Sequence, residues 1–304
     1  MKSETLKASI IIPARNAART LPATIRSIFM DPMHIYSEVI VVNDANEEEI
    51  FELASKFPIR IIRGNGRGAA AARNIGVQVS HGEILIFLDA DCWVQPGWLS
   101  AHLRTHALFN GLLAVGGSIC MDLDASFWAK CDHFCSWFNV NPGLPAGWVP
   151  NHTPANLSIR RKTFDQVGSF QEDLPHSGVH EEAFWQSRLL HLGGRIRFEP
   201  QAAVYHLDRN DLKGFLKHNY RWGYNSISVK NKTGVSRFPW IFKKPWILVI
   251  GFIPFAAVHS IYTIICWLRA GRLKVLEFIP FIFLGRLVYA TGMFIGRLQT
   301  TQKK

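Results

Sequence analysis

The chain has 304 residues, of which 48% are hydrophobic and 19% are charged. This length and composition exclude a disordered chain and suit one large domain, or one domain with an appendage. The formal net charge of +11 does not indicate nucleic-acid binding, because residues 1–206 carry 18 Lys and Arg against 20 Asp and Glu, whereas residues 207–304 carry 16 against 3.

The first half of the chain alternates between predicted strands and helices. Buried strands are predicted at 8–14, 38–45, 59–64 and 84–91, and helices at 18–29, 47–57 and 69–80. This alternation predicts an α/β fold, Rossmann-like, with a mainly parallel sheet covered by helices on both faces. In such sheets ligands bind beyond the carboxyl ends of the strands. One cleft is therefore expected to collect the three strand ends 13–15, 43–46 and 89–91.

Two carboxylates end the last of these strands in "ILIFLDAD", Asp89 and Asp91, with Ala90 between them. Like charges repel, so the pair gains nothing from burial without a partner. Carboxylates at this spacing can converge on Mg²⁺, which takes one or two carboxylates together with phosphate oxygens of its substrate. In isolation the motif favours a solvated turn, where Asp is common.

Five segments in order along the chain resemble family 2 glycosyltransferases of the GT-A fold. They are residues 9–28, 38–45, 68–91, 154–170 and 180–206. The resemblance covers about two thirds of the chain. It implies a nucleotide-sugar donor, with a UDP-sugar favoured over a GDP-sugar, a Mg²⁺ or Mn²⁺ ion, and inverting transfer of the sugar to a hydroxyl acceptor.

The resemblance also implies the residues of the donor site. Asp44 corresponds to the aspartate that contacts the nucleotide base, and Pro13, Ala14 and Arg15 are expected near the same base and ribose. Asn43 stands where the family usually has a first aspartate, so the details of base and ribose binding differ in this chain.

The metal site follows from the same resemblance. Asp91 corresponds to the principal metal ligand, and Asp89 to a residue that contacts the ribose, or the metal through water, with Ala90 in the same donor-binding turn. His206, which closes "AVYH", is a candidate ligand of the metal or the diphosphate, or else a structural histidine. Arg73 is expected either to meet the donor phosphates or to hold its helix in place.

An inverting transfer needs a base on the face of the sugar opposite the departing diphosphate. The stretch "HEEAFW" matches the family's Glu-Asp pair at the start of a helix, so Glu182 is the candidate base and Glu181 the reserve. Both acids would also favour the amino terminus of a helix through its dipole, without any catalytic role.

The last third of the chain is strongly apolar. Residues 245–268 contain no charge and at helical rise could cross a bilayer, and a second apolar segment, 274–296, contains Glu277 and Arg286. Basic clusters flank both segments. Two spanning helices, with the outer basic flanks on the cytoplasmic side, are narrowly favoured. A re-entrant or interfacial hairpin, which would keep every basic cluster on the cytoplasmic face, is the alternative.

These features divide the chain into a GT-A domain at 1–206, interfacial or amphipathic linker helices at 207–243, and a membrane-associated helical hairpin with a basic tail at 244–304. No signal peptide is recognised, so the catalytic domain is expected on the cytoplasmic face of the cell membrane. A hairpin beside the site suggests a lipid-linked or membrane-presented glycan acceptor.

A short motif in the linker, "HNYRW", resembles the Q-x-x-R-W motif of membrane-embedded polysaccharide synthases. It makes Arg221 a candidate ligand of the donor diphosphate. Trp222 is a candidate acceptor-stacking residue, or a residue of the membrane interface.

Two other motifs are assigned to structure. "CDHFC", at 131–135, lacks the second cluster that would complete a zinc site and is interpreted as a helix face with buried cysteines. The glycines of "GNGRG", at 64–68, do not match the dinucleotide fingerprint.

Two other functions remain as alternatives. A sugar-phosphate nucleotidyltransferase would require a Gly-rich pyrophosphate-binding loop near the amino terminus, and "PARNAART" has no glycine. The second alternative is a non-catalytic membrane adaptor that retains the fold. It is suggested by two departures from the family pattern, Asn43 in place of an aspartate and Glu181-Glu182 in place of the Glu-Asp pair.

Overall fold

A computed structural model of the chain describes residues 7–122, 124–172, 181–233 and 251–302. The chain forms two compact units. The first unit comprises residues 1–120 and 145–206, and the second comprises residues 121–144 and 207–304. The segment 121–144, expected in the amino-terminal domain, therefore belongs to the second unit.

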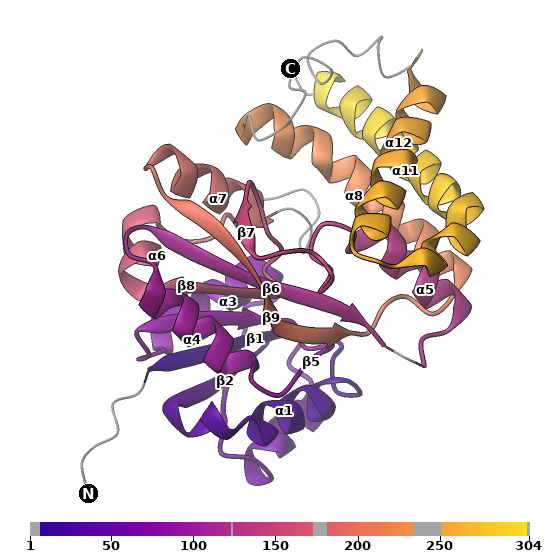
Figure 1. Ribbon diagram of the computed structural model, residues 1–304. Helices are drawn as coiled ribbons and strands as arrows, with labels where there is room; N and C mark the ends of the chain where they lie inside the picture. Colours follow the sequence, from indigo (N-terminus) through magenta and orange to yellow (C-terminus); the bar gives the residue numbers. More distant parts are fainter. Residues whose placement is uncertain (1–6, 123, 173–180, 234–250, 303–304) are drawn as a thin grey trace, which may run out of the picture. The chain divides into compact units, whose positions relative to one another are not determined.

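Within the described residues, nine strands form one sheet in the order β3-β2-β1-β4-β8-β6-β9-β5, with β7 also pairing with β9 (Figure 1). Strands β1 to β4 are parallel, as predicted. Their bounds and those of the other strands are β1 Ala8–Ala14, β2 Ser37–Asn43, β3 Arg60–Arg63, β4 Ile84–Leu88, β5 Cys92–Val94, β6 Leu113–Met121, β7 Gly147–Val149, β8 Asn156–Arg160 and β9 Arg195–His206.

The sheet is mixed, where the sequence predicted a mainly parallel one. β8 pairs antiparallel with β4 and β6, and β5 and β7 pair antiparallel with β9. One reason lies in the turn 89–91 between β4 and β5. A parallel neighbour needs a crossover of about a dozen residues or more, which this turn cannot provide, so β5 pairs with β9 instead.

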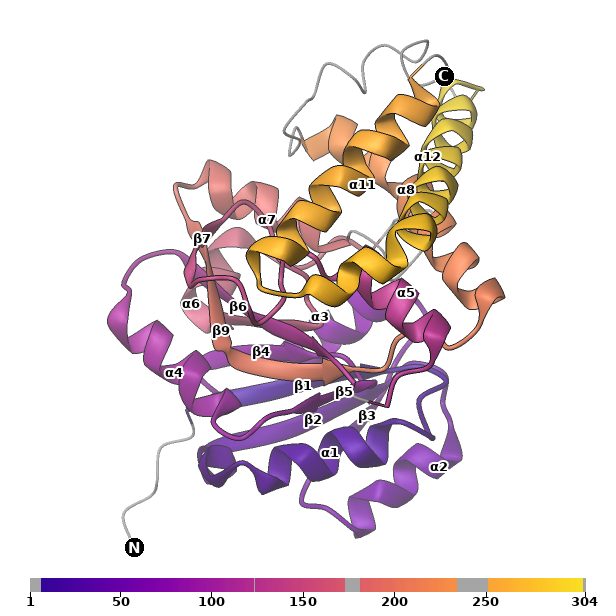
Figure 2. The ribbon, with the colours of Figure 1, turned by 45° about the vertical axis from the view of Figure 1, so that its right-hand side comes forward.

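Helices cover both faces of the sheet in the first unit. α1 and α4 lie on one face, and α3, α6 and α7 lie on the other (Figure 2). On the second face, Ile11, Leu85 and Phe87 pack with Ala70 of α3 and Trp185 of α7. The helices are α1 Leu21–Met30, α2 Glu48–Phe51, α3 Ala69–Val79, α4 Trp98–Leu108, α6 Arg161–Val167 and α7 Glu181–His191, with short 3₁₀ segments η1 Pro32–Tyr36 and η2 Glu52–Ser55.

Several predicted elements differ from the structure at their bounds, and two of these differences bear on the site or the helix type. The helix expected at 47–57 is a single α-turn, α2, followed by the 3₁₀ segment η2. The strand expected at 84–91 ends at Leu88, so the two carboxylates lie in the turn after β4 and not in the strand. This placement puts them at the carboxyl edge of the parallel strands, where ligands bind in such sheets.

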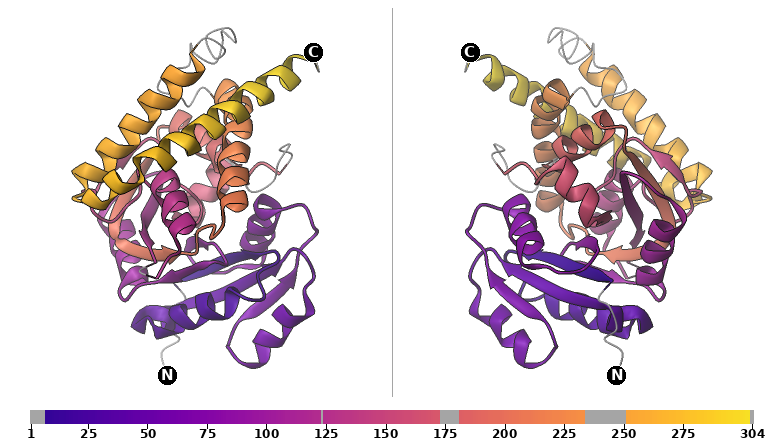
Figure 3. Two further views of the ribbon diagram at one scale, coloured as in Figure 1. Left: turned by 90° about the vertical axis from the view of Figure 1, so that its right-hand side faces the viewer. Right: turned by 90° about the vertical axis from the view of Figure 1, so that its left-hand side faces the viewer.

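The second unit is helical. It contains α5 (Phe127–Ser136), α8 (Leu212–Thr233), α11 (Phe252–Arg269), η3 (Leu273–Phe278) and α12 (Ile279–Gln302), and α8 and α12 lie side by side (Figure 3). α5 belongs here because Phe134 and Cys135 pack with Phe215, Trp267 and Ile282. The predicted C-terminal hairpin is confirmed as α11, η3 and α12. Residues 234–250, which include the start of the first apolar segment, lie outside the described residues.

Two buried Asp–His pairs hold the second unit together. The Asp132 carboxylate accepts a hydrogen bond from His218 Nδ1 at 2.7 Å, which joins "CDHFC" to "HNYRW". The Asp208 carboxylate accepts hydrogen bonds from His133 Nδ1 at 2.7 Å and Trp137 Nε1 at 2.8 Å. Asp132 and His133, the polar side chains of "CDHFC", are therefore engaged in hydrogen bonds within the second unit.

The cysteines of "CDHFC" are neutral thiols. Burial raises the pKa of Cys131 and of Cys135 to about 12. Cys131, Asp132, His133 and Cys135 are all almost fully buried, so the interpretation of this motif as a buried helix face agrees with the structure.

Candidate functional site

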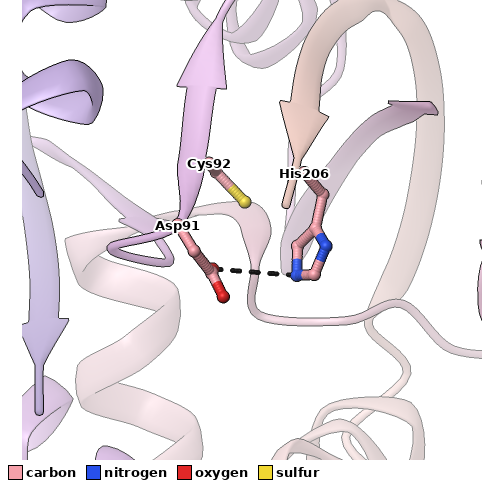
Figure 4. A group of neighbouring side chains, drawn as sticks. All are labelled: Asp91, Cys92 and His206. Carbon is pink, nitrogen blue, oxygen red and sulfur yellow. Dashed lines mark ion pairs between the residues drawn. The ribbon is translucent and has the colours of Figure 1, made fainter. Parts of the chain in front are cut away.

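The strand ends of the first unit bring Asp91 and His206 together. Cys92, the first residue of β5, is paired antiparallel with His206, the last residue of β9. This register sets Asp91 beside His206, with the carboxylate oxygen 3.7 Å from Nε2 (Figure 4). The His206 ring is almost fully buried, whereas the Asp91 carboxylate is 36% exposed and accessible to a ligand. A carboxylate and an imidazole at this spacing can bind one cation.

Cys92 joins this group and was not anticipated from the sequence. Its sulfur points toward the same space (Figure 4), and one ligand atom from each of Asp91, Cys92 and His206 lies within 4.8 Å of the others. Cys92 is fully buried. Its position next to Asp91 was visible in the sequence, but only the pairing of β5 with β9 brings the sulfur to the imidazole.

Asp89, the other carboxylate of the turn, is paired with Arg73. Arg73 Nη2 donates to Asp89 Oδ1 at 2.7 Å, and the Arg73 side chain is 4% exposed. The two expectations for Arg73 were donor contact and a structural role, and this contact supports the structural role. The negative charge of Asp89 is thus offset by the guanidinium of Arg73.

Backbone contacts fix the turn itself. The Asp89 N–H donates to the Ala155 carbonyl at 3.3 Å, and the Ala90 carbonyl accepts from Thr24 Oγ1 at 3.0 Å. The first contact joins the turn to the residue before β8, and the second joins it to α1. Ala90 therefore acts through its backbone, and its side chain is buried.

Asp44 organises the Gly-rich loop at 64–68. Its two carboxylate oxygens accept the backbone N–H groups of Gly66 at 2.9 Å and Gly68 at 2.8 Å. Both glycines have positive φ angles of 73° and 98°, which side chains disfavour. A Cβ at Gly64 would lie 2.7 Å from Asp44 Cα. The "GNGRG" motif is therefore explained by close packing on Asp44 at Gly64 and by the positive φ angles of Gly66 and Gly68.

Arg15 lies at the same loop. Its Nη1 is 3.6 Å from Asp44 Oδ2 and donates to the Gly66 carbonyl at 3.3 Å, with about half of its side chain exposed. The Ala14 carbonyl accepts the Asp44 N–H at 2.7 Å, and Pro13 precedes it in β1. The residues predicted near the nucleotide base are thus neighbours in the structure.

Asn43 has a structural role that an aspartate could not fill. Its Nδ2 donates to the Glu47 carbonyl at 2.7 Å, and its Oδ1 accepts the Glu47 N–H at 3.0 Å. The Glu47 carboxylate in turn accepts the N–H groups of Ala17 and Ala18. The amide supplies the donor that the first contact needs, so the departure from the family pattern stabilises this loop.

A buried polar network lies beneath the turn. Asn156, at the start of β8, donates to the carbonyls of Ser118 in β6 and Ala202 in β9, and accepts from Trp98 Nε1 at 2.9 Å. His102 Nε2 donates to the Asn156 amide oxygen at 3.0 Å. Because Asn156 follows Ala155, the network supports the backbone that holds Asp89.

The same network sets the tautomers of two histidines. Since His102 Nε2 carries its proton, His102 Nδ1 accepts from Ser158 Oγ at 2.8 Å. Ser158 Oγ then accepts from His106 Nε2 at 2.9 Å. Burial lowers the pKa of His102 to about 4 and that of His106 to about 3, and burial also lowers the pKa of His152 to about 4. All three are neutral at pH 7.

The candidate base lies on α7. Glu182 is half-buried, one turn before Gln186, whose amide oxygen accepts the His152 N–H at 3.1 Å. Trp185 Nε1 donates to the Gly168 carbonyl at 2.8 Å. These contacts fix the register of the helix that bears Glu182. The side chain of Glu181 and residues 173–180 before it lie outside the described residues.

Arg221 and Trp222 belong to α8 in the second unit. Trp222 packs edge-on against His218 and Trp137, with ring centroids 5.4 and 6.3 Å apart, and contacts the cluster around Tyr289. The ring is therefore part of the packing of that unit. Arg221 is half-buried on the same helix.

The sequence model of Glycosyl transferase family 2 matches residues 9–170, more than half of the chain. The chain belongs to glycosyl transferase family 2. The matched region contains β1 to β8, the Gly-rich loop and the Asp89–Asp91 turn. The chain is therefore a glycosyltransferase, and the family resemblance of the sequence is confirmed.

Curated relatives agree with this family membership. The chain is 27% identical to "Glycosyltransferase AglE" of Haloferax volcanii over 254 residues, which cover 81% of each protein. It is also 27% identical to "Pre-mycofactocin glycosyltransferase" of Mycobacterium tuberculosis over 227 residues, 71% of this chain. The chain spans 46% of the length of that second relative.

Solved structures share the fold. The mannosyltransferase PcManGT of Pyrobaculum calidifontis, in complex with GDP-Man and Mn²⁺, superposes with a TM-score of 0.66 and 17% identity, covering 97% of this chain and 88% of its own. GalNAc-T7 with UDP, GalNAc and Mn²⁺ superposes with a TM-score of 0.54 and 17% identity, covering 80% and 57%. The GT-A fold of this glycosyltransferase is thereby confirmed.

Proposed function

We propose that this family 2 glycosyltransferase transfers a sugar from a nucleoside diphosphate donor to a hydroxyl acceptor with inversion, and that a divalent cation binds at Asp91 and His206. The observation that supports the proposal most directly is the 3.7 Å approach of Asp91 to His206 at the carboxyl edge of the parallel strands. A partly exposed carboxylate beside a buried imidazole supplies two donor atoms that suit a divalent cation.

The donor atoms suit the proposed ion. Carboxylates bind Mg²⁺ and Mn²⁺, whereas the imidazole of His206 favours Mn²⁺, because Mg²⁺ prefers an all-oxygen shell. Cys92 is not proposed as a ligand, since a buried thiol is a soft donor. A bound cation would supply positive charge at the departing diphosphate. Asp89, held by Arg73, would then contact the ribose or a metal-bound water.

The base and ribose of the donor are assigned to the loop around Asp44. Arg15 is exposed there for contact, and Pro13 and Ala14 line the adjacent strand end. Asp44 would contribute to donor binding mainly by holding the loop 64–68 in place, because its oxygens already accept two backbone N–H groups of that loop. We favour a UDP-sugar over a GDP-sugar, and the two solved neighbours, one with UDP and one with GDP-Man, make both worth testing.

Glu182 is proposed as the base that takes the proton from the acceptor hydroxyl, with Glu181 as the reserve. Fixed register of α7 would hold the carboxylate in place while the hydroxyl oxygen attacks the anomeric carbon. Arg221 is proposed to meet the diphosphate, whereas Trp222, whose ring packs against His218 and Trp137, is not retained as an acceptor residue.

The acceptor is proposed to be a lipid-linked or membrane-presented glycan. Two described segments, Phe252–Arg269 (α11) and Leu273–Leu298 (η3 and most of α12), are long and apolar enough to cross a membrane. Attachment to the cell membrane, with the first unit on the cytoplasmic side, would concentrate enzyme and acceptor in one plane.

Thermal unfolding with nucleotides tests the donor and metal together. The full chain is heated with UDP, GDP, CMP or dTDP, each with and without Mn²⁺ or Mg²⁺. A nucleotide at about 100 times its dissociation constant adds about 2.7 kcal/mol of stability. We expect one nucleoside diphosphate to stabilise the protein only with metal, and Asp91→Asn to abolish that response. A Cys92→Ser variant should retain it. A metal-independent response in the wild-type protein would refute the metal site.

A further inference from the structure

The apolar hairpin could attach to a membrane in two ways, and the packing of the second unit distinguishes them. In a spanning arrangement α11 and α12 would cross the bilayer. In an interfacial arrangement they would lie along its surface. The deciding features are the partner of α12, the polar groups on its faces, and the position of the exposed apolar side chains of α11.

α12 is packed against α8 with almost no space between the two backbones. A Cβ at Gly292 would lie 2.2 Å from the Tyr220 carbonyl oxygen, and one at Gly296 would lie 2.5 Å from that of Tyr224. In the reverse direction, a Cβ at Gly223 would lie 1.9 Å from the Tyr289 carbonyl oxygen. Small residues allow such close approach of helices. α8 and α12 must therefore occupy the same depth relative to a membrane.

α8 is a polar helix. Its 22 residues include five Lys and Arg and no acidic residue. The part of α8 that faces the middle of α12, from Phe215 to Tyr224, contains Lys217, which is exposed, and Arg221. If α12 spanned a bilayer, these charges would lie near its centre, where charged side chains are costly. The pairing of α8 with α12 thus opposes a spanning α12.

Another face of α12 is polar as well. Arg286 is 4% exposed, and its Nη2 donates to the Cys135 carbonyl of α5 at 2.6 Å and to Thr263 Oγ1 of α11 at 2.8 Å. α5 in turn contains the buried Asp132 and His133. α12 therefore packs within a protein core on the sides that face α8 and α5.

The exposed apolar side chains of this unit are concentrated on α11 and η3. On α11, Val258, Ile261, Ile265 and Leu268 recur at helical spacing and are 36–67% exposed, while the opposite side buries Ala256, Ser260, Thr263 and Trp267. Leu273 and Leu276 of η3 extend this surface, with exposures of 69% and 48%. We call the six exposed residues the apolar stripe.

Basic residues lie among the last members of the apolar stripe in sequence. Arg269 ends α11, Arg272 lies between α11 and η3, and Lys274 lies in η3, and all three are exposed. Glu277 is the single acidic residue from 252 to 304 in the sequence. An apolar stripe beside cationic side chains fits the surface of an anionic bilayer, into which apolar groups insert while Arg and Lys meet the lipid headgroups.

We propose that the second unit binds in the plane of an anionic membrane surface, with the apolar stripe in the acyl–headgroup boundary and Arg269, Arg272 and Lys274 on the headgroups, and that neither α11 nor α12 crosses the bilayer. The proposal deepens the membrane attachment of the proposed function and rests on it. It also places the turn 270–274 on the same side of the membrane as the first unit.

Side-specific labelling tests the topology. The full chain with Cys266→Ser, which removes the half-buried cysteine, receives Arg272→Cys, and membranes are treated with an impermeant maleimide from either side. The matched control is Lys56→Cys, exposed in the first unit. We expect both cysteines to react from the same side. Reaction of Arg272→Cys only from the side opposite to Lys56→Cys would show a spanning hairpin and overturn the proposal.

Vesicle flotation tests whether the apolar stripe binds an anionic membrane surface. The full chain is mixed with vesicles of phosphatidylcholine alone or with phosphatidylglycerol added. We expect the anionic vesicles to bind at least tenfold more tightly, and Val258→Asp with Ile261→Asp to reduce binding at least tenfold. Leu108→Asp, an equally exposed leucine in the first unit, should not change it. Equal binding by the stripe variant would refute the docking surface.

The two experiments also separate this proposal from the proposed function. If vesicles fail to bind the wild-type protein at all, membrane presentation of the acceptor fails with the docking surface. If the protein binds membranes but spans them, only the in-plane arrangement fails. The metal-dependent nucleotide response of Asp91 is independent of both outcomes.

Discussion

Acid should unfold the first unit, because three histidines are buried there in neutral form. The pKa values of His102, His106 and His152 are lowered from 6.5 to about 4, 3 and 4, chiefly by burial. Below pH 6.5 the unfolded chain binds protons that the folded chain does not. The stability contributed by these groups is therefore fully present above pH 6.5 and is lost as the pH falls toward their folded values.

The expected size of the effect follows from these values. At pH 5 each unfolded histidine is almost fully protonated, while its folded counterpart is almost fully neutral. Each histidine then contributes about 2 kcal/mol less to the free energy of unfolding than at pH 7.5, since one pKa unit corresponds to about 1.4 kcal/mol. The three together remove about 6 kcal/mol, which is comparable to the whole stability of many domains.

Urea unfolding of the full chain between pH 7.5 and 5, followed by circular dichroism, measures this loss. The diagnostic variant is His106→Gln, because the glutamine amide can still donate to Ser158 Oγ but does not titrate. It should lose about 4 kcal/mol over the same range, against about 6 for the wild type. A wild-type stability that does not change between pH 7.5 and 5 would refute the reasoning.

Three other substitutions follow from contacts in the structure. Asn43→Asp removes the donor to the Glu47 carbonyl, so urea unfolding should show a loss of about 1–3 kcal/mol. Arg73→Gln leaves the charge of Asp89 without its guanidinium, so kcat/KM for the nucleotide sugar should fall at least tenfold in a transfer assay. Gly292→Ala forces α8 and α12 apart and should lower the free energy of unfolding by about 1–3 kcal/mol, measured by thermal unfolding in detergent.

Matched controls separate these effects from general damage. Asn65→Asp keeps its acceptor to the Arg67 N–H and should leave stability unchanged. Arg104→Gln removes an exposed arginine remote in sequence from the turn and should leave kcat/KM unchanged. At Gly147 a Cβ would meet nothing closer than 4.0 Å, so Gly147→Ala should be tolerated. Equal effects in a variant and its control would contradict the assigned contact.

Local sequence patterns predict much of the secondary structure of this protein, its C-terminal hairpin and its family. Strands β1 to β4 and helices α1 and α3 follow from hydrophobic periodicity within about ten residues, although the strand predicted at 84–91 ends at Leu88. The C-terminal hairpin is evident from two long apolar segments, of which 245–268 has no charge. The family, and with it the glycosyltransferase activity, follows from segments in register along the sequence.

Tertiary structure decided the rest, because the deciding contacts join residues far apart in the chain. The sheet is mixed because β8 pairs antiparallel with β4 and β6, and β9 pairs antiparallel with β5 and β7, which periodicity does not encode. The pairing of β5 with β9 is what places Cys92 and Asp91 beside His206. The partners of Arg73 and Asp44, likewise, appear only when a helix and a loop meet the strand ends.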